Sequence, residues 1–216
     1  MPRESKKALL ERTQSIVNGL KETYPDAHCE LDYRNPLELL IATILSAQCT
    51  DKQVNIVTKD LFKKYRKAAD YADAPLPELE NSIRRIGLFR SKAKNIKACC
   101  NTLVDEHGGK VPPDIDALVK LGGVGRKTAN VVLGNAFNIN HGVVVDTHVK
   151  RLCSLLRLTK GTTPERIEKD LMTIVPQEDW TLFSHWIIWH GRRRCPARRP
   201  QCNECEINHL CPSSQA

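Results

Sequence analysis

Four cysteines crowd into the last part of the sequence at a spacing that could hold a metal centre. They are Cys195, Cys202, Cys205 and Cys211, in the pattern C-x6-C-x2-C-x5-C. Four thiolates on a loop can surround one tetrahedral zinc ion, or they can occupy the corners of an iron–sulfur cube. The spacing does not decide between these two kinds of centre. Because such a density disfavours four unrelated free thiols, we predict a bound centre here.

The segment that carries these cysteines is also rich in arginine. Between Gly191 and Cys202 the chain has no acidic residue and five arginines, Arg192, Arg193, Arg194, Arg198 and Arg199. Guanidinium groups bind phosphate, so the run predicts an edge that contacts a nucleic-acid backbone, with Arg198 and Arg199 as contact residues. A solvated arginine run without a partner is the alternative.

A second group of residues could bind phosphate through the main chain. Gly122-Gly123-Val124-Gly125 separates two short helical patterns and predicts a helix-hairpin-helix over about 114–136. Glycines let the backbone approach a phosphate, and the N-terminus of the following helix directs N–H groups at it. Arg126, Lys127 and Thr128 occupy that helix start. A glycine turn alone is weak evidence, because many such turns only end a helix.

Lys127 and Asp146 are of types that could carry nucleophilic and acid–base chemistry. Lys127 lies near a positive helix end beside Arg126, where the potential disfavours its ammonium form and favours a nucleophilic amine. Asp146 would be its carboxylate partner, although an anion by itself favours the ammonium form. The simpler interpretations are a solvated lysine and an N-cap for a helix that begins at Thr147.

The elements that must position these residues are predicted to be helices almost throughout. Apolar residues recur at helical spacing along the chain, and Asn35-Pro36, Thr50 or Asp51, and Thr162 with Glu165 are typical helix starts. Further helices are expected around residues 9–24, 79–86, 91–107 and 179–190, and a central apolar one after Pro36. Residues 143–145 form the only strand-like run, which is too short for a sheet. We therefore expect an all-α protein.

The composition favours a folded protein with a nucleic-acid partner and disfavours disordered and membrane-spanning classes. The 216 residues include 33 Lys and Arg against 25 Asp and Glu, a net charge of +8, which suggests a polyanionic partner such as nucleic acid. With 41% hydrophobic residues the chain should fold. The longest nearly apolar stretch, residues 37–45, is far below the roughly 20 residues of a membrane helix. No secretory signal is readable, so we expect a cytoplasmic protein, associated with the nucleoid in a prokaryote, with no membrane partner.

The other five cysteines are expected to be small core residues. They are Cys29, Cys49, Cys99, Cys100 and Cys153, scattered through apolar helical patterns. Disulfides are not expected, because a reducing compartment keeps thiols free.

Together these motifs resemble the endonuclease III family of DNA glycosylases. The resemblance rests on residues 121–129 (LGGVGRKTA), residues 145–148 (VDTH) and the four terminal cysteines, and residues 46–51 (SAQCTD) and 86–92 (IGLFRSK) extend it over nearly the whole chain. Two positions depart from the family. Gly122 stands where proline is common, which would loosen the hairpin entry, and Cys49 replaces a usual alanine.

The resemblance implies a fold and a set of site residues. It implies a six-helix barrel lobe over residues 29–139 and a discontinuous lobe of residues 1–28 and 140–216 around a [4Fe-4S] cluster on the four terminal cysteines. Lys127 matches the nucleophile and Asp146 the catalytic carboxylate. The positions that match DNA contacts are Gln48, Leu88 and His148, which enter the space of a flipped nucleotide, and the hairpin residues Gly123, Val124, Gly125, Arg126 and Thr128.

The implied activity is that of a monomeric base excision repair enzyme on double-stranded DNA. It would remove oxidised pyrimidines as a DNA N-glycosylase and cleave the abasic site on its 3′ side by β-elimination through a lysine Schiff base. An adenine mismatch glycosylase is disfavoured, because those proteins generally lack the lysine at this position. A non-catalytic iron–sulfur DNA-binding protein or redox sensor would share the charge and the cysteines but would leave Lys127 and Asp146 unexplained.

Overall fold

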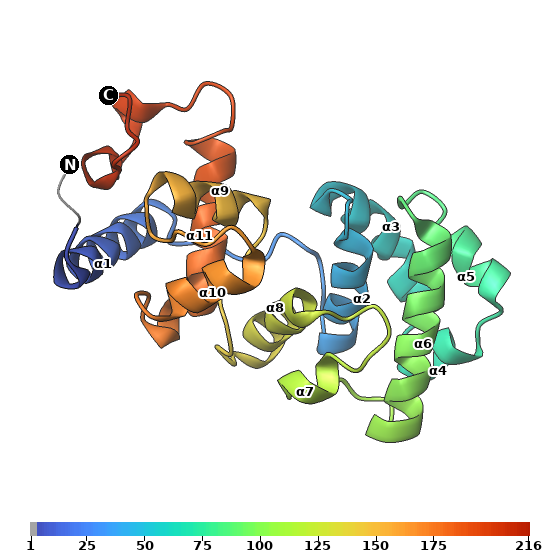
Figure 1. Ribbon diagram of the computed structural model, residues 1–216. Coiled ribbons are helices and arrows are strands. Elements are labelled where there is room, and N and C mark those ends of the chain that lie inside the picture. The colour runs from blue at the N-terminus through green and yellow to red at the C-terminus, as the bar shows by residue number, and fades with distance from the viewer. Residues whose placement is uncertain (1–3) are drawn as a thin grey trace. The chain divides into compact units, whose positions relative to one another are not determined.

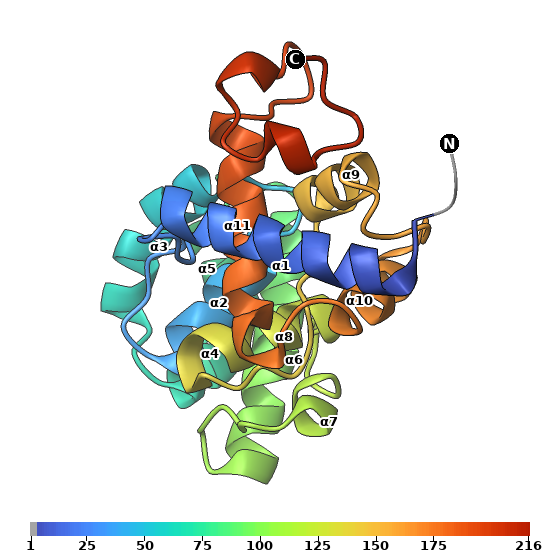
Figure 2. The same cartoon turned by 90° about the vertical axis from the view of Figure 1, so that its left-hand side faces the viewer.

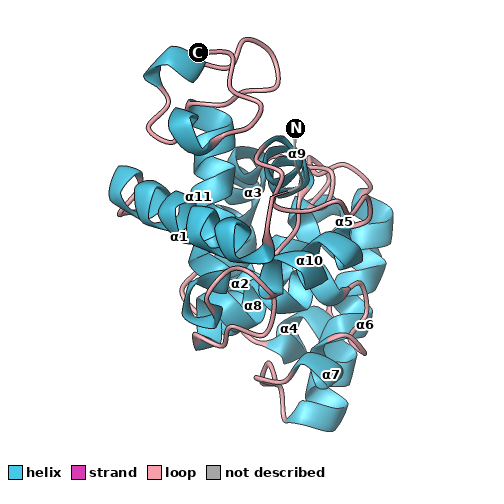
Figure 3. Ribbon diagram, turned by 60° about the vertical axis from the view of Figure 1, so that its left-hand side comes forward, coloured by secondary structure: helices cyan, strands magenta, loops and turns pink. Residues whose placement is uncertain are grey.

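The computed structural model describes residues 4–216 of the chain. In that range it contains α-helices and three short 3₁₀ turns but no strand, as Figures 1 and 3 show. The all-α prediction is therefore confirmed. The chain forms two compact units. We call residues 29–139 the hairpin unit, and the chain up to His28 together with Asn140–Ala216 the cysteine unit.

The hairpin unit, all of whose residues are described, contains seven helices around one hydrophobic core. The helix α2 packs against α3, α6 and α8, and its apolar side chains are almost fully buried, so it is central as its sequence predicts. The helices are α2 (Pro36–Ser46), α3 (Asp51–Lys64), α4 (Ala68–Asp73), α5 (Leu76–Ser82), α6 (Phe89–His107), α7 (Ile115–Leu118) and α8 (Arg126–Phe137).

The start of α2 has the predicted N-cap, but Asn35 and Glu38, which have the residue types and spacing of a capping box, do not form one. Asn35 accepts a hydrogen bond from the Glu38 backbone N–H at 3.0 Å, and Pro36 takes the first helical position. The Glu38 carboxylate, however, accepts from the backbone N–H of Arg34 at 2.8 Å and not from that of Asn35. Its ion pair with the Arg34 guanidinium, also at 2.8 Å, draws the carboxylate toward that residue.

Three other local predictions need correction. The six-residue helix α4 was not predicted, because it is too short to show a helical period. The helix α6 begins at Phe89, two residues before Ser91. Thr163 rather than Thr162 caps α10 (Pro164–Met172), because Pro164 fits the first helical position, where no N–H is needed.

The cysteine unit is built around α11 (Trp180–Arg193), whose side chains Phe183, Trp186 and Ile187 are buried. The helices α1 (Lys6–Thr23) and α9 (Thr147–Leu155) both pack on α11, and Figure 2 shows α1 crossing it. The remaining elements are α10 and three 3₁₀ turns, η1 (Gln177–Asp179), η2 (Cys202–Glu204) and η3 (Asn208–Leu210). Among residues 4–216 no helix has both the length and the apolar character that crossing a membrane requires.

All nine cysteines are free, and most of the predicted core cysteines are deeply buried. Cys99, Cys100 and Cys153 are fully buried, which confirms the prediction for these three. Cys29 and Cys49 are only partly buried, at the edge of the hairpin unit's core. Burial raises the pKa of the Cys29 thiol to about 11, so it stays protonated at neutral pH.

Candidate functional site

Local signals build the hairpin between α7 and α8. The Asp114 carboxylate caps α7 by accepting a hydrogen bond from the Ala117 N–H at 2.8 Å. Gly123 has a φ of 75°, a left-handed conformation that favours glycine, and it turns the chain between the two helices. A Cβ atom on Gly122 would lie 3.0 Å from the carbonyl oxygen of Asn95 on α6. A side chain at position 122 would therefore require α6 to shift.

The start of α8 is a positively charged helix end without a side-chain cap. Its N-cap is Gly125, which has no side chain to accept a capping hydrogen bond. No acidic residue lies in that turn, although the helix dipole favours anions there. Arg126 and Lys127 are exposed instead. This end of α8 is therefore suited to a phosphate group, and the Lys127 side chain is accessible to a substrate.

The other predicted hairpin contacts divide into main-chain and side-chain positions. Val124 is buried in the core of the hairpin unit, so only its backbone is available to a ligand. Gly123 and Gly125 are exposed and likewise present only backbone. Thr128 is half-buried on the first turn of α8. The predicted DNA contacts at Gly123, Val124 and Gly125 are thus limited to backbone groups.

Gln48 and Leu88 are exposed residues in strained backbone conformations. Gln48 has a φ of 54° and Leu88 a φ of 57°, both in the left-handed region. For residues other than glycine this costs on the order of 1 kcal/mol or more each. Leu88 is 61% exposed, which is unusual for a leucine at the start of a helix. A Cβ on Gly87 would lie 3.9 Å from the Gln48 carbonyl oxygen, so the two loops adjoin.

Asp146 and His148 lie at the start of α9 in the cysteine unit. The Asp146 carboxylate accepts a hydrogen bond from the Val149 N–H at 2.8 Å, so the N-cap interpretation is confirmed. Asp146 remains partly exposed. His148 packs its Nδ1 against Gly191 of α11, and that buried atom has no hydrogen-bond partner in the described part of the chain. Asp146 and His148 therefore share one helix end, whereas Lys127 belongs to the hairpin unit.

The four terminal cysteines line one cavity in the cysteine unit. The cavity has a volume of about 30 Å³, and its other lining residues include Leu152, Leu156 and Ile207. Within residues 4–216 no three His, Cys, Asp or Glu side chains are grouped tightly enough to hold a single metal ion. The support for a centre is thus the shared cavity and its four sulfur donors, which suit an iron–sulfur cluster.

Polar side chains from other elements surround these cysteines. The His190 ring lies between the Tyr24 hydroxyl, 3.1 Å from its Nδ1, and the Cys205 sulfur, 3.6 Å from its Nε2. Arg151 donates to the Cys195 carbonyl oxygen at 2.6 Å. Burial lowers the pKa of His190 to about 4, so its ring is neutral at neutral pH. Burial raises the pKa of the Cys205 thiol, and the neighbouring Cys195 and Cys211 raise it further.

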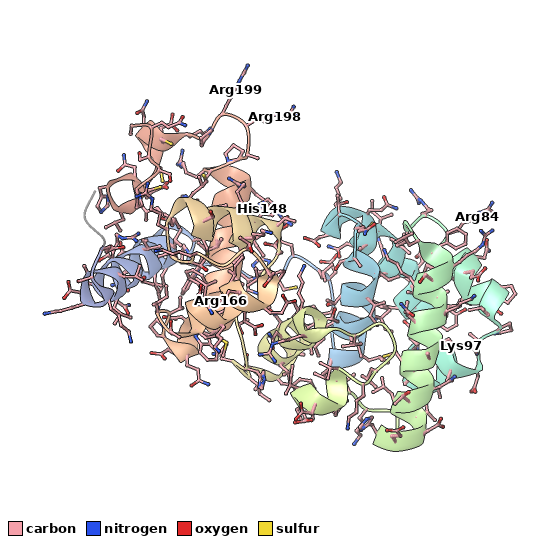
Figure 4. The ribbon with its side chains drawn as sticks, viewed as in Figure 1. Arg84, Lys97, His148, Arg166, Arg198 and Arg199 are labelled. Atoms are coloured by element: carbon pink, nitrogen blue, oxygen red, sulfur yellow. The ribbon has the colours of Figure 1, made fainter. Side chains whose placement is uncertain are left out.

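The arginines of the run between Gly191 and Cys202 differ in whether their guanidinium groups are already paired within the protein. Arg194 is bound on both sides of its guanidinium, to Glu204 at 2.8 Å and Glu206 at 2.9 Å. The arginine run contains no acidic residue, and both of these glutamates follow Cys202 in the sequence. The Arg193 guanidinium stacks 3.7 Å from the centre of the Trp189 ring. Arg198 and Arg199 are exposed, and in Figure 4 their side chains extend away from the helices, so both are available to a partner.

Sequence reasoning missed several residues that shape these sites. Lys92 is 4% exposed and binds two backbone carbonyls, although lysines are usually assigned to the surface. The available signal was its position in the apolar stripe of α6, one residue before Ala93 and four before Ile96. For Arg151 and His190 no local signal exists, because their partners lie far away in the sequence.

Comparison with known proteins identifies the family. A family model described as "HhH-GPD superfamily base excision DNA repair protein" matches residues 41–177. The chain is 54% identical over 206 residues to a protein of Synechocystis sp., covering 95% of this chain and 94% of the relative. It is 45% identical over 207 residues to a Bacillus subtilis protein, with the same coverage. Both relatives bear the name endonuclease III.

Solved structures agree with this assignment. An endonuclease III trapped as a covalent intermediate with DNA matches with a TM-score of 0.89 and 49% identity, covering 94% of this chain and 96% of that one. A thermostable thymine-DNA glycosylase matches with a TM-score of 0.81 but 23% identity, which supports the fold alone. The chain belongs to the HhH-GPD superfamily of base excision DNA repair proteins and, within it, to the endonuclease III family of DNA glycosylases and AP lyases.

Proposed function

We propose that the protein removes oxidised pyrimidines from double-stranded DNA and then cleaves the strand on the 3′ side of the abasic site. The observation that carries this proposal is the exposed Lys127 on the uncapped first turn of α8. A helix end that attracts phosphate brings a DNA backbone to the one residue that can act as an amine nucleophile there. The endonuclease III structure with covalently trapped DNA supports the same chemistry for this chain.

Lys127 acts as the nucleophile in this mechanism. Its neutral Nζ attacks C1′ of the damaged nucleotide, and the bond from C1′ to the base breaks. The base leaves with that electron pair and takes up a proton. Nζ then gives up a proton, the C1′–O4′ bond breaks as O4′ takes up a proton, and a protonated Schiff base is left between Nζ and C1′. Loss of a proton from C2′ allows the C3′–O bond to break. The leaving group is the phosphate, which becomes the 5′-phosphate of the DNA fragment on the 3′ side.

Asp146 assists the chemistry while it caps α9. One of its carboxylate oxygens accepts from the Val149 N–H, which fixes the side chain on the helix end. The carboxylate stabilises the positive charge that develops on the sugar as the base departs, and it assists proton transfer. An anion held rigidly on a helix is preorganised for this task.

The remaining predicted residues bind and distort the DNA. Gln48, Leu88 and His148 occupy the space left by the extruded nucleotide, and a damaged base is easier to extrude because it pairs poorly. Backbone groups of Gly123, Val124 and Gly125, with Arg126 and Thr128, hold phosphates. The final phosphate contacts in this proposal come from Arg198 and Arg199, which are both exposed.

Cys195, Cys202, Cys205 and Cys211 would hold a [4Fe-4S] cluster in their common cavity. When bound, the cluster supplies bonds between the end of α11 and the loop that follows it, and so acts structurally. Arg194, Arg151 and His190 complete the surroundings by binding the loop or approaching its cysteines. The cluster thereby keeps Arg198 and Arg199, which lie between two of its ligands, in position.

A borohydride trapping experiment tests the proposed function. Borohydride reduces a Schiff base to a stable bond, so wild-type protein should become covalently attached to duplexes that carry a single oxidised pyrimidine or an abasic site. Lys127→Gln should abolish the adduct and keep lesion binding. Lys120→Gln is the matched control, because Lys120 is an exposed lysine on the other side of the same hairpin. An adduct that persists in Lys127→Gln would overturn the assignment.

Asp146→Asn separates the catalytic role from the cap. Asparagine is as good an N-cap as aspartate, so α9 and the overall stability should be unchanged. The rate of base release in a single turnover on a thymine-glycol duplex should nevertheless fall by about two orders of magnitude or more. A rate close to that of wild type would reduce Asp146 to a cap alone.

A non-catalytic iron–sulfur DNA-binding protein is the second candidate. The cysteine cavity and the exposed Arg198 and Arg199 favour it equally well. It predicts DNA binding without any adduct in the trapping experiment, for every lesion tested. The wild-type result therefore decides between the two functions before any variant is made.

A further inference from the structure

One buried lysine joins the two strained, exposed residues of the hairpin unit. The Nζ of Lys92 donates hydrogen bonds to the carbonyl oxygens of Leu45, at 2.9 Å, and Ala47, at 2.6 Å. Ala47 directly precedes Gln48. The backbone N–H of Lys92 donates to the carbonyl oxygen of Leu88 at 3.0 Å. Lys92 thus contacts the chain beside Gln48 through its side chain and Leu88 through its main chain.

The side chain of Lys92 also completes the end of α2. The last carbonyls of a helix have no partner within the helix, and a cation is favourable at that negative end of its dipole. Leu45 and Ala47 are such terminal positions, at the last turn of α2 and at its C-cap. The chain leaves α2 at this point and turns into the left-handed Gln48, so the lysine fixes where that turn begins.

The strain at Gln48 and Leu88 indicates that they are held in place. Left-handed conformations of residues other than glycine persist only when the surroundings impose them. Neither residue is packed in the core, because both side chains are exposed, with Leu88 at 61%. The restraints must therefore act through neighbouring backbone. Besides the bonds of Lys92, the Gln53 side-chain amide on the first turn of α3 donates to the Arg85 carbonyl oxygen at 3.4 Å, three residues before Leu88.

Burying a lysine for packing alone would be unfavourable. Lys92 lies in the apolar stripe of α6, where a methionine would fill similar space without desolvating an amine. Burial lowers the pKa of Lys92, as expected for a cation removed from water. The free-energy cost of burying the amine must therefore be offset by an interaction that an apolar side chain cannot make. The hydrogen bonds to the two carbonyl oxygens are that interaction.

We infer that Lys92 is a positioning residue that sets Gln48 and Leu88 together as one rigid wedge for insertion into the DNA duplex. This inference rests on the proposed function, since the wedge has a use only if the protein extrudes a nucleotide. A polar and an apolar side chain, held on two adjoining loops, can fill the gap in a base stack while donating to the unpaired base opposite. Preorganising them removes the cost of ordering the loops during binding.

The chain offers a matched control on the same helix. Lys97, which Figure 4 labels on α6, also donates to two backbone carbonyls, those of Ala72 and Ala74. It holds the connection between α4 and α5, away from Gln48 and Leu88. Lys92→Met and Lys97→Met therefore remove the same kind of contact from two different loops.

The test measures duplex distortion separately from affinity. Duplexes carry an abasic-site analogue opposite 2-aminopurine, whose fluorescence rises when its stacking is disrupted. Lys92→Met should lose most of this rise, and its preference for the abasic duplex over undamaged duplex should fall about tenfold or more. The salt dependence of binding to undamaged duplex should not change, because no phosphate contact is removed. Lys97→Met should match wild type in all three measurements.

Each outcome bears on the inference. Equal losses in Lys92→Met and Lys97→Met, or no loss in either, would overturn it while leaving the proposed function intact. If Lys92→Met does not fold, Lys92→Gln, whose amide still donates to one carbonyl, should fold and show a partial loss of the fluorescence rise. If Lys92→Gln also fails to fold while Lys97→Met folds, Lys92 is a core residue and the inference is wrong. Wild-type protein without a fluorescence rise, lesion preference or borohydride adduct would instead refute the proposed function.

Discussion

Each of the two units is held together internally by different means. The hairpin unit is a continuous segment whose seven helices, all described, share one hydrophobic core. The cysteine unit combines two segments that are distant in the sequence, and after Arg193 it contains only the turns η2 and η3. Its end is bound by side chains, among them Arg12, which donates to the carbonyl oxygens of Leu156 and Leu210.

The difference explains where each unit places its functional residues. In the hairpin unit Gln48 and Leu88 are left-handed residues on loops between packed helices. In the cysteine unit the loop that carries Arg198 and Arg199 also has a left-handed residue, Arg199 with a φ of 59°, but this loop lies beyond the last α-helix. It depends on polar contacts, chiefly those of Arg194, and on the proposed cluster. The stability of the two units should therefore respond differently to the loss of a cysteine ligand of the proposed cluster, to low pH and to a larger side chain in the core.

Removing one proposed cluster ligand should have the largest effect. Wild-type protein should contain about four iron and four sulfide ions per chain, and Cys205→Ser should contain almost none. The segment after Arg193 should then become sensitive to protease, while residues 29–139 remain protected. Limited proteolysis with mass spectrometry measures both. Cys49→Ser, a change of the same kind in the hairpin unit, is the control and should keep iron and resistance. Unaltered protease resistance in Cys205→Ser would contradict the proposed structural role.

Acid should destabilise the cysteine unit more than the hairpin unit. All histidines of the chain except His107 belong to the cysteine unit, and burial lowers the pKa of His185 from 6.5 to about 4. The unfolded chain therefore binds a proton that the folded chain excludes. The stability from neutral His185 is complete above pH 6.5 and falls as the pH drops toward 4, by up to about 3 kcal/mol.

Tryptophan fluorescence can follow this unit selectively. The three tryptophans all lie on α11, so urea unfolding monitored by their emission reports the cysteine unit. Between pH 7 and pH 5 the wild-type midpoint should decrease, and the decrease should be smaller in His185→Gln. Identical decreases in the two proteins would show that His185 is not the group responsible.

Added volume at the hairpin should destabilise the hairpin unit. A Cβ on Gly122 would lie 2.9 Å from Ala98 Cβ and 3.0 Å from backbone atoms of α6, so Gly122→Ala should cost about 1–3 kcal/mol. At Gly125 a Cβ would meet nothing within 4 Å, so Gly125→Ala is the matched control and should cost much less. Circular dichroism in urea measures both. Equal costs would mean that α6 moves to accommodate the methyl group.

The smallest effect should come from the exposed arginines. Replacing both Arg198 and Arg199 by alanine should flatten the salt dependence of binding to undamaged duplex by up to about two phosphate contacts. Arg194→Ala should leave the salt slope nearly unchanged, because its guanidinium is already paired with Glu204 and Glu206. Fluorescence anisotropy over a range of salt concentrations gives the slopes. A steeper loss for Arg194→Ala would mean that the loop's position, not its two exposed charges, governs DNA affinity.

Local signals predicted much of the fold because helix starts are encoded by neighbouring residues. Asn35, Asp114 and Asp146 all cap helices as side-chain acceptors, which is visible in the sequence. The family and its activity were also predicted, from motifs in which residue type and spacing are both restricted. The detailed roles of Lys127, Asp146 and the DNA contacts stay predictions.

Features that depend on distant partners could not be predicted from local sequence. Gln48 and Leu88 adopt left-handed conformations without being glycine, and the contact of Lys92 on α6 with the end of α2, which we infer restrains them, joins residues 45 positions apart. The proline usual at position 122 was expected to matter for loop stiffness alone. The close approach of α6, which would crowd a Cβ there, involves residues more than twenty positions earlier. Likewise, Arg194 looked available for phosphate until its acidic partners were located beyond Cys202.

The packing of α1 on α11 has a consequence for the order of events during protein synthesis. The side chains Ile16, Val17 and Leu20 of α1 are buried in the core of the cysteine unit. Their partners on α11 leave the ribosome about 160 residues later, which at roughly 5–20 residues per second is a delay of about 10 to 30 seconds. During that time the complete hairpin unit can fold, while α1 waits with an apolar face exposed. A nascent chain stalled before residue 180 should therefore be a preferred chaperone client through its first helix.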